Sequence, residues 1–178
     1  MNVAGWSANN RPEKTNDLET VKNVQDVLTG YTGSYRSALE IGAGVGRLAR
    51  EMCKSFNLVV GVDVSQALVD ESQKYLAEFP SARVLKGDGL HIPVDSDKFD
   101  FVYSYVTFQH MYTLEIIRAN IEEAFRVLKS GGTCRIQTVK GKSNTYEGEG
   151  GIHRSYLFED EKDFLQLFWT RDSTHQLK

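Results

Sequence analysis

The chain has 178 residues, a length that predicts one domain with a core large enough to fold on its own. Its formal net charge of −3 and pI near 5.8 argue against a broad nucleic-acid-binding surface. Cys53 and Cys134 lack the spacing of metal ligands, so we expect no metal site. No apolar run could span a bilayer, and the first residues are too polar for a secretion signal. We therefore expect a cytoplasmic protein.

Residues 1–36 predict a polar tail followed by a helix. Residues 1–15 are rich in turn formers and could form either a disordered tail or a flap over an active site. A helix is expected from Asn16, which can cap its N-terminus, to the glycines Gly30 and Gly33, which can end it. The expected core face of this helix consists of apolar side chains at helical spacing: Leu18, Val21, Val24 and Leu28.

Residues 38–49 (ALEIGAGVGRLA) have the pattern of a short strand, a turn with glycines at alternate positions, and the start of a helix. Glycine lets the backbone turn sharply and leaves main-chain N–H groups open to a ligand. The following helix would direct its free amides toward the same point. This pattern is typical of a nucleotide-type site at the carboxyl end of the first strand, Ser37–Ile41, of an open α/β sheet.

The glycines alone leave the ligand open. Residues 44–49 (GVGRLA) also fit the dinucleotide pattern G-x-G-x-x-A, and Asp63 follows at about the distance which that pattern expects. Glu40 favours a different ligand, because a carboxylate just before the first glycine would repel a pyrophosphate and attract a cation. A sulfonium that carries an α-amino group has that charge.

Two more carboxylates follow strands that are expected to neighbour the first. Residues 57–63 form a nearly continuous apolar run, typical of a buried parallel strand. Asp63 at its end could accept hydrogen bonds from the ribose hydroxyls of an adenosine, or could serve the N-terminus of the helix that begins at Ser65. Residues 82–86 predict a third strand; Asp88 in the GDG that follows could accept from an adenine amino group, or belong to a common Asp-Gly turn.

The rest of the core continues the alternation of strands and helices. Residues 99–105 predict a fourth strand and residues 133–139 a fifth. The helix between them is expected to end at Gly131-Gly132 and to bury Leu114, Ile117, Ile121, Ala124, Phe125 and Leu128. Regular alternation of this kind predicts a Rossmann-like α/β fold, a doubly wound and mostly parallel sheet with helices on both faces.

Residues 37–139 resemble the class I S-adenosylmethionine (SAM)-dependent methyltransferases. Glu40 to Gly46 match the acidic-G-x-G-x-G signature of that family in full, and residues 99–110 (FDFVYSYVTFQH) and 122–132 (EEAFRVLKSGG) resemble its fourth strand and its turn into the fifth. The resemblance implies a cofactor-binding core over 37–139 that takes SAM and releases S-adenosylhomocysteine. The cofactor-binding residues that it implies are Glu40, Gly42, Ala43, Gly44, Gly46, Asp63, Val64, Asp88, Gly89, Ser104 and Tyr105, the last two along the methionine part.

The reaction implied is direct displacement of the methyl group by an oxygen or nitrogen nucleophile of a small-molecule acceptor. Such a reaction depends mainly on alignment, and a general base assists it when the nucleophile carries a proton. His110 is the candidate base, since it follows the fourth strand and has a suitable ordinary pKa. In the resemblance it holds the second place of a His-His pair whose first place is Gln109. His110 could equally well pack or cap its loop.

Residues 140–178 predict a flexible loop, 140–155, and a helix over 159–168. In the loop, His153, Arg154 and Tyr156 could line an acceptor pocket or could be exposed residues without a special role. A full sheet of this family has two more strands, and so few residues follow 168 that these strands must be abbreviated or missing. Either the sequence is truncated, or the sheet has an unfinished edge.

A homodimer partner or the N-terminal segment could cover such an edge. The shortened C-terminus leaves a non-catalytic SAM-binding or interaction module as an alternative function. An NAD-type dehydrogenase domain is a further alternative, disfavoured by Glu40 and by the lack of room for a substrate domain.

Overall fold

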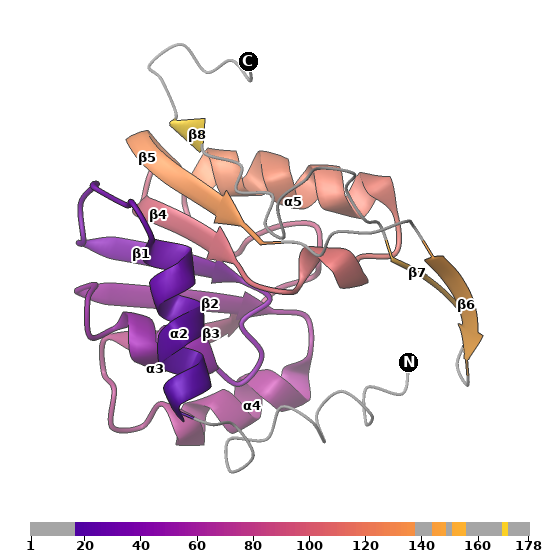
Figure 1. Cartoon of the computed structure of the whole chain (residues 1–178), viewed down its shortest axis with the longest axis horizontal. Coiled ribbons are helices and arrows are strands. Elements are labelled where there is room, and N and C mark those ends of the chain that lie inside the picture. Colours follow the sequence, from indigo (N-terminus) through magenta and orange to yellow (C-terminus); the bar gives the residue numbers. More distant parts are fainter. Residues whose placement is uncertain (1–16, 138–143, 149–150, 156–168, 171–178) are drawn as a thin grey trace.

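The structure is a computed structural model that describes residues 17–137, 144–148, 151–155 and 169–170 (Figure 1). Several sequence predictions lie outside the described residues and side chains. They are the tail or flap over 1–15, the Asn16 cap, the helix over 159–168, and the side chains of His153, Arg154 and Tyr156.

A single sheet of strand order β3-β2-β1-β4-β5-β8 forms the centre of the fold. Strands β1 to β5 are parallel, and β8 pairs antiparallel with β5. The strands are β1 (Ser37–Ile41), β2 (Leu58–Asp63), β3 (Ala82–Lys86), β4 (Phe99–Ser104), β5 (Leu128–Ile136) and β8 (Trp169–Thr170). The chain order reverses between β1 and β4. In doubly wound folds the crevice beyond the strand ends at such a point is where ligands bind.

Helices cover both faces of this sheet (Figure 1). They are α2 (Asp17–Leu28), α3 (Arg47–Met52), α4 (Gln66–Tyr75) and α5 (Leu114–Val127), with a short 3-10 helix η2 (Phe108–His110). Side chains of α2, α3 and α4 belong to one buried cluster and those of α5 to another. Strand side chains alternate between the two clusters, Ala38 and Phe101 in the first and Leu39 and Val102 in the second. The predicted doubly wound fold is confirmed.

The inward face of α2 differs from the expected apolar stripe. Leu18, expected in the core, is 77% exposed, whereas Thr20, Asn23, Val24 and Val27 are buried. The reason is tertiary: Thr20 Oγ1 accepts a hydrogen bond from Arg47 Nη1 at 3.0 Å, and Asn23 Oδ1 accepts one from the Tyr105 hydroxyl at 2.8 Å. Two polar side chains therefore turn toward the sheet and rotate Leu18 out to solvent.

The boundary between α5 and β5 also differs from the prediction. The helix ends at Val127, and Leu128 already has extended dihedral angles (φ −70°, ψ 137°), so the glycines at 131–132 do not end the helix. They lie instead within β5, where its pairing with β4 shifts between Phe99 and Phe101. Leu114, expected in the apolar face, is 60% exposed because it starts the helix beyond the edge of the core.

The segment expected to be a flexible loop contains a hairpin. Strands β6 (Asn144–Gly148) and β7 (Gly151–Ser155) pair antiparallel as a separate two-stranded sheet, and β7 contacts η2. Polar and glycine-rich composition concealed these strands, because a hairpin without an apolar face shows no alternation. Among the described residues the last strand of the main sheet is short, as predicted: β8 pairs there with β5 at Thr133 and Cys134. Coverage of that edge by a second copy stays a prediction.

The burial difference between two leucines gives a test of this fold. Leu39 on β1 is 0% exposed, and Leu39→Ala should lower the free energy of unfolding by about 2–5 kcal/mol through lost burial and a residual cavity. Leu18→Ala, the matched control on α2, should change it by no more than about 0.5 kcal/mol. Urea unfolding of both variants measures the difference. A large loss from Leu18→Ala would contradict the orientation of α2.

Candidate functional site

The turn after β1 is built on three glycines with left-handed backbone angles. Gly42, Gly44 and Gly46 have φ of 78°, 56° and 85°, a region that glycine enters without the clash of a Cβ. A Cβ at Gly42 would lie 2.2 Å from Thr107 Cγ2, and one at Gly46 would lie 2.8 Å from Leu76 Cδ1. At Gly44 a Cβ would meet no atom of the described residues within 4 Å, so those residues leave the backbone there open. The two outer glycines allow Thr107 and Leu76 to pack closely against the turn, and the central one leaves room for a ligand.

Asp63 at the end of β2 ties this turn to the start of α4. Its Oδ2 accepts the Gly44 N–H at 2.7 Å and its Oδ1 accepts the Ser65 N–H at 2.8 Å. Because Ser65 is the N-cap of α4, Asp63 does serve the N-terminus of this helix, which was one of the two roles expected for it. A carboxylate has about four acceptor positions, and the two bonds leave the other positions available to a ligand. Val64, next in the chain, is 60% exposed and lies against Gly89, where an added Cβ would be 3.3 Å from Val64 Cγ1.

Glu40 is buried among the residues that support the turn. It is 3% exposed, and its Oε2 accepts the Tyr103 hydroxyl at 3.0 Å across the β1–β4 pair. Burial raises the pKa of Glu40 to about 8, with a smaller contribution from the charge of Asp63. The Tyr103 hydrogen bond and the charge of Arg47 act in the opposite direction. Glu40 and Asp63 are thus close enough for their charges to interact.

Asp88 is engaged by its own turn. Its Oδ1 accepts the N–H groups of Leu90 at 2.8 Å and of His91 at 2.6 Å, and its Oδ2 lies 3.2 Å from His91 Nδ1. Hydrogen bonds from the His91 and Leu90 amides hold the pKa of Asp88 at about 2. These contacts show that Asp88 belongs to an Asp-Gly turn, one of the two roles expected for it. Contact with an adenine amino group stays a prediction for Asp88.

The turn after β4 closes the other side of the site. The Ser104 hydroxyl donates to the Ile41 carbonyl oxygen at 2.8 Å and is buried, so this side chain joins β4 to β1. Tyr105 reaches α2 through Asn23, and Thr107 Oγ1 donates to the Gly42 carbonyl oxygen at 3.3 Å. The Val106 N–H donates to Gln137 Oε1 at 2.7 Å. The two turns, after β1 and after β4, therefore contact each other directly.

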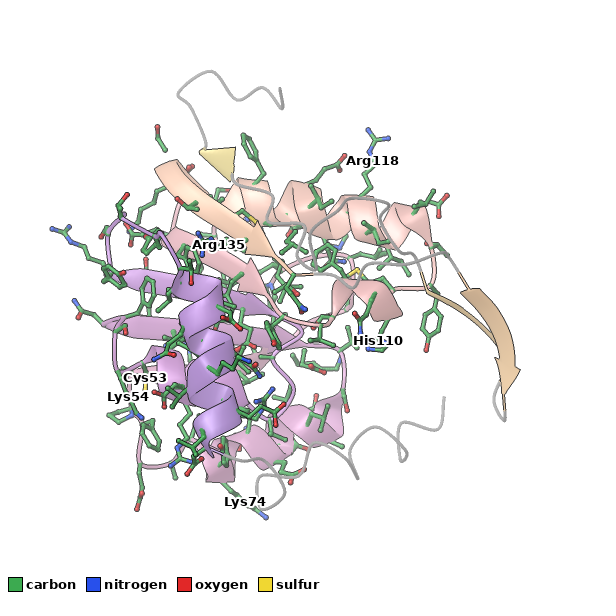
Figure 2. All side chains as sticks on the ribbon, in the orientation of Figure 1. Cys53, Lys54, Lys74, His110, Arg118 and Arg135 are labelled. Atoms are coloured by element: carbon green, nitrogen blue, oxygen red, sulfur yellow. The ribbon has the colours of Figure 1, made fainter. Side chains whose placement is uncertain are left out.

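His110 ends the η2 helix on the side of the molecule that faces the β6–β7 hairpin (Figure 2). Its Nε2 lies 3.1 Å from Gln109 Nε2, and which nitrogen carries the proton is not fixed by heavy-atom positions. Partial desolvation lowers the pKa of His110. A lowered pKa keeps the imidazole neutral near pH 7, the form that a general base requires.

Sequence reasoning missed the supporting side chains, chiefly Tyr103, Thr107, Asn23 and Gln137. Gln137 could have been found by the rule that singled out Asp63, since it is a polar residue directly after a strand. Tyr103 and Thr107 act through cross-strand and turn-to-turn contacts that have no local signature.

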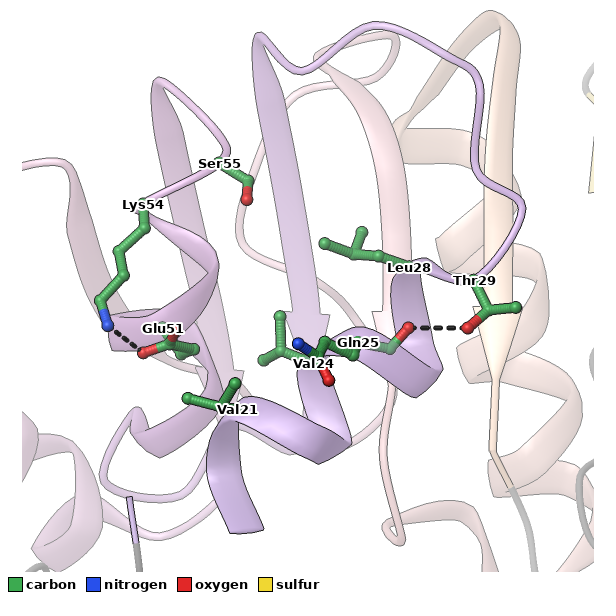
Figure 3. Close-up of a pocket in the computed structure, with 8 residues that line it drawn as sticks. All are labelled: Val21, Val24, Gln25, Leu28, Thr29, Glu51, Lys54 and Ser55. Atoms are coloured by element: carbon green, nitrogen blue, oxygen red, sulfur yellow. Dashed lines mark hydrogen bonds and ion pairs between the residues drawn. The ribbon is translucent and has the colours of Figure 1, made fainter. Parts of the chain in front are cut away.

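A shallow hollow of about 340 Å³ lies between α2 and the end of α3 (Figure 3). It is lined by Val21, Val24, Gln25, Leu28, Thr29, Glu51, Lys54 and Ser55. The Lys54–Glu51 ion pair of 2.5 Å crosses its rim. Because α3 runs away from the glycine turn, this hollow lies apart from the candidate cofactor site.

Comparison with known proteins agrees with this geometry. A family model for a methyltransferase domain matches residues 39–136, which hold the glycine turn, Asp63 and the turn after β4. The chain belongs to the class I SAM-dependent methyltransferase family.

Among curated relatives of this methyltransferase domain, phosphoethanolamine N-methyltransferase 2 of Caenorhabditis elegans is 30% identical over 85% of this chain and 34% of its own length. A sterol 24-C-methyltransferase of Schizosaccharomyces pombe is 33% identical over 69% of this chain and 32% of its own length. The solved structure of Haemonchus contortus phosphoethanolamine N-methyltransferase 1, in complex with phosphoethanolamine and S-adenosylhomocysteine, superposes with a TM-score of 0.59. It is 18% identical, covers 86% of this chain and 32% of that one, and shows the shared fold.

The chain thus spans about a third of the length of these relatives. Within the part of the methyltransferase domain that the structure describes, no helix is long and apolar enough to cross a membrane. The same residues contain no group of three or more His, Cys, Asp or Glu side chains placed to hold a metal ion.

The buried carboxyl of Glu40 predicts a pH-dependent stability. Its pKa of about 8 in the folded chain exceeds the ordinary value of 4.5, so the folded state holds more protons than the unfolded state between these values. The free energy of unfolding should therefore fall as pH rises from about 5 to about 8, by at most about 1.4 kcal/mol per pH unit. Urea unfolding of wild type and Glu40→Gln across this range tests it. A difference between the two that stays constant with pH would contradict the protonated state.

Proposed function

We propose that the glycine turn binds SAM and that the chain transfers its methyl group to an oxygen or nitrogen nucleophile of a small-molecule acceptor by direct displacement. The observation that carries this proposal is the set of left-handed glycines, of which Gly44 is left open by the described residues while Asp63 holds its N–H. A ligand can approach this backbone where a side chain would block it.

The residues present fit SAM. The free acceptor positions of Asp63 suit the ribose hydroxyls, and the exposed side chain of Val64 beside Gly89 offers an apolar surface to an adenine ring. Ala43, Gly44 and Gly46 supply the backbone that such a ligand would follow. Glu40 places a titratable carboxyl below the turn, where a cation would favour its ionised form.

SAM supplies the electrophilic methyl group when bound, so the chain needs no nucleophile of its own. What the chain contributes is alignment, which in well-oriented systems can account for about 7–11 kcal/mol of a barrier. Asp63 and the glycine turn orient the cofactor, and the turn after β4 borders the place where an acceptor would sit. His110 is the group we assign to accept a proton from an acceptor hydroxyl or ammonium.

Two relatives support a small-molecule acceptor, one named for phosphoethanolamine and one for sterols. The first is named as an N-methyltransferase and the second as a C-methyltransferase, so only the first supports a nitrogen nucleophile. These two acceptors differ in polarity and charge, so they define the range to be tried first. A dinucleotide gains nothing from the buried Glu40 carboxyl, because a pyrophosphate would keep that carboxyl protonated, whereas the cation of SAM would favour its ionised form.

Calorimetric titration with SAM, S-adenosylhomocysteine and NAD tests the cofactor, and radiolabelled methyl transfer tests the acceptor. The acceptor panel contains phosphoethanolamine, sterols and other small amines and alcohols. Binding of NAD without binding of SAM would refute the proposal. SAM binding with no turnover on any acceptor would favour a non-catalytic SAM-binding module.

Replacement of Asp63 should weaken SAM binding selectively. Asp63→Ala removes the proposed ribose acceptor and also frees the Gly44 amide, and we expect a loss of about 1.5–3 kcal/mol of binding free energy. Asp70→Ala is the matched control, because Asp70 is an exposed carboxylate of α4 that contacts Gln66 at 2.7 Å. Calorimetry with SAM measures both. Equal affinities in the two variants would show that the ribose assignment is wrong.

Replacement of His110 should separate chemistry from binding. If the imidazole accepts the proton, His110→Ala should lower the rate of methyl transfer at saturating SAM by roughly 10²–10⁴-fold. SAM affinity should stay at the wild-type value. Single-turnover transfer to the best acceptor of the panel, together with calorimetry, measures the two quantities. A variant with normal turnover would exclude the role of base.

A further inference from the structure

The turn after β4 contains a residue in a conformation that its side chain disfavours. Val106 has φ of 62°, in the left-handed region. For a β-branched residue this region is a true outlier, because two branches at Cβ crowd the adjacent backbone. Such a conformation persists only where surrounding contacts hold it.

Three contacts surround Val106, one from each neighbouring element. Gln137, directly after β5, accepts the Val106 N–H at 2.7 Å through its side-chain oxygen. Tyr105, before it, is joined to α2 through Asn23 at 2.8 Å. Thr107, after it, contacts the glycine turn so closely that a Cβ at Gly42 would be 2.2 Å from its Cγ2.

Of these contacts, only the one from Gln137 is made to Val106 itself. The Gln137 backbone N–H also donates to the Ser104 carbonyl oxygen at 2.8 Å, which extends the β4–β5 pairing by one step and fixes where the side chain begins. The amide oxygen of Gln137 therefore reaches the Val106 N–H from a backbone that the sheet already holds.

We propose that Gln137 is a positioning residue, which holds Val106 in its left-handed conformation and thereby sets Thr107 against the glycine turn. The inference rests on the proposed function, since it assigns Gln137 to the half of the cofactor site nearer β4. Without the Gln137 oxygen, Val106 would return to negative φ, and Tyr105 and Thr107 would move with it. The half of the site formed by Asp63 and Val64 lies at the end of β2 and would be unaffected.

Two substitutions of Gln137 separate its oxygen from its size. Gln137→Leu keeps similar bulk and removes the acceptor, whereas Gln137→Glu keeps an acceptor oxygen at the same position. Calorimetry with adenosine reads the half formed by Asp63 and Val64 alone, whereas S-adenosylhomocysteine occupies both halves, so the comparison of the two ligands isolates the half nearer β4. We expect Gln137→Leu to bind S-adenosylhomocysteine roughly tenfold more weakly with unchanged adenosine affinity, and Gln137→Glu to bind both as wild type does.

A glycine at 106 provides the rescue that a general loss of stability would not show. Glycine enters the left-handed region without penalty, so adding Val106→Gly to Gln137→Leu should restore most of the affinity for S-adenosylhomocysteine. Equal affinities of Gln137→Leu and Gln137→Glu, or a double variant that regains nothing, would overturn the positioning role.

Hydrogen exchange in the wild-type chain tests the same contact without a variant. The Val106 amide should exchange slowly, and exchange at the rate of a free amide would overturn the inference even if Gln137→Leu fails to fold. If the wild type and Gln137→Leu bind S-adenosylhomocysteine equally well, the positioning role alone is refuted. A wild type that binds neither S-adenosylhomocysteine nor SAM refutes the proposed function.

Discussion

The carboxylate of Asp63 holds the candidate cofactor site together. Its two oxygens join the Gly44 amide of the turn after β1 to the Ser65 amide at the start of α4. Charged acceptors make stronger hydrogen bonds than neutral ones, so this one side chain fixes a backbone that three glycines would otherwise leave free. A turn set in this way loses less conformational freedom on binding, which favours affinity.

Glu40 stands in contrast, because its position opposes stability. It is a buried residue of β1, a strand that is buried along its whole length. The Tyr103 hydroxyl and the Ala49 backbone N–H donate hydrogen bonds to its carboxyl group. A leucine there would avoid the cost of burying a carboxyl group. A nearby cation favours the ionised form of a carboxyl whose pKa is about 8. Binding of a cationic ligand would therefore explain why a carboxyl occupies this buried position.

The sheet could be predicted from the sequence because its strands are buried apolar runs that end in polar residues, as the run up to Asp63 shows. The inward face of α2 could not, because Thr20 and Asn23 are buried by hydrogen bonds to Arg47 and Tyr105, residues distant in sequence. The same holds for the site. Its glycines and Asp63 follow a local pattern, whereas the left-handed Val106 depends on contacts with β5 and with the glycine turn, which a linear pattern does not contain.

These contacts give α2 a defined place over the site. Arg47 meets Thr20 near the start of the helix, Tyr105 meets Asn23 in its middle, and Arg135 of β5 donates to the Val27 and Thr29 carbonyl oxygens at its end (Figure 2). Directional hydrogen bonds at three points add to the apolar packing of Val24 and Val27 in fixing the position of the helix on the sheet. Because Arg47 begins the helix after the glycine turn and Tyr105 begins the turn after β4, α2 contacts both sides of the candidate site. The helix, the two turns and the strand ends therefore form one connected support for the candidate cofactor site.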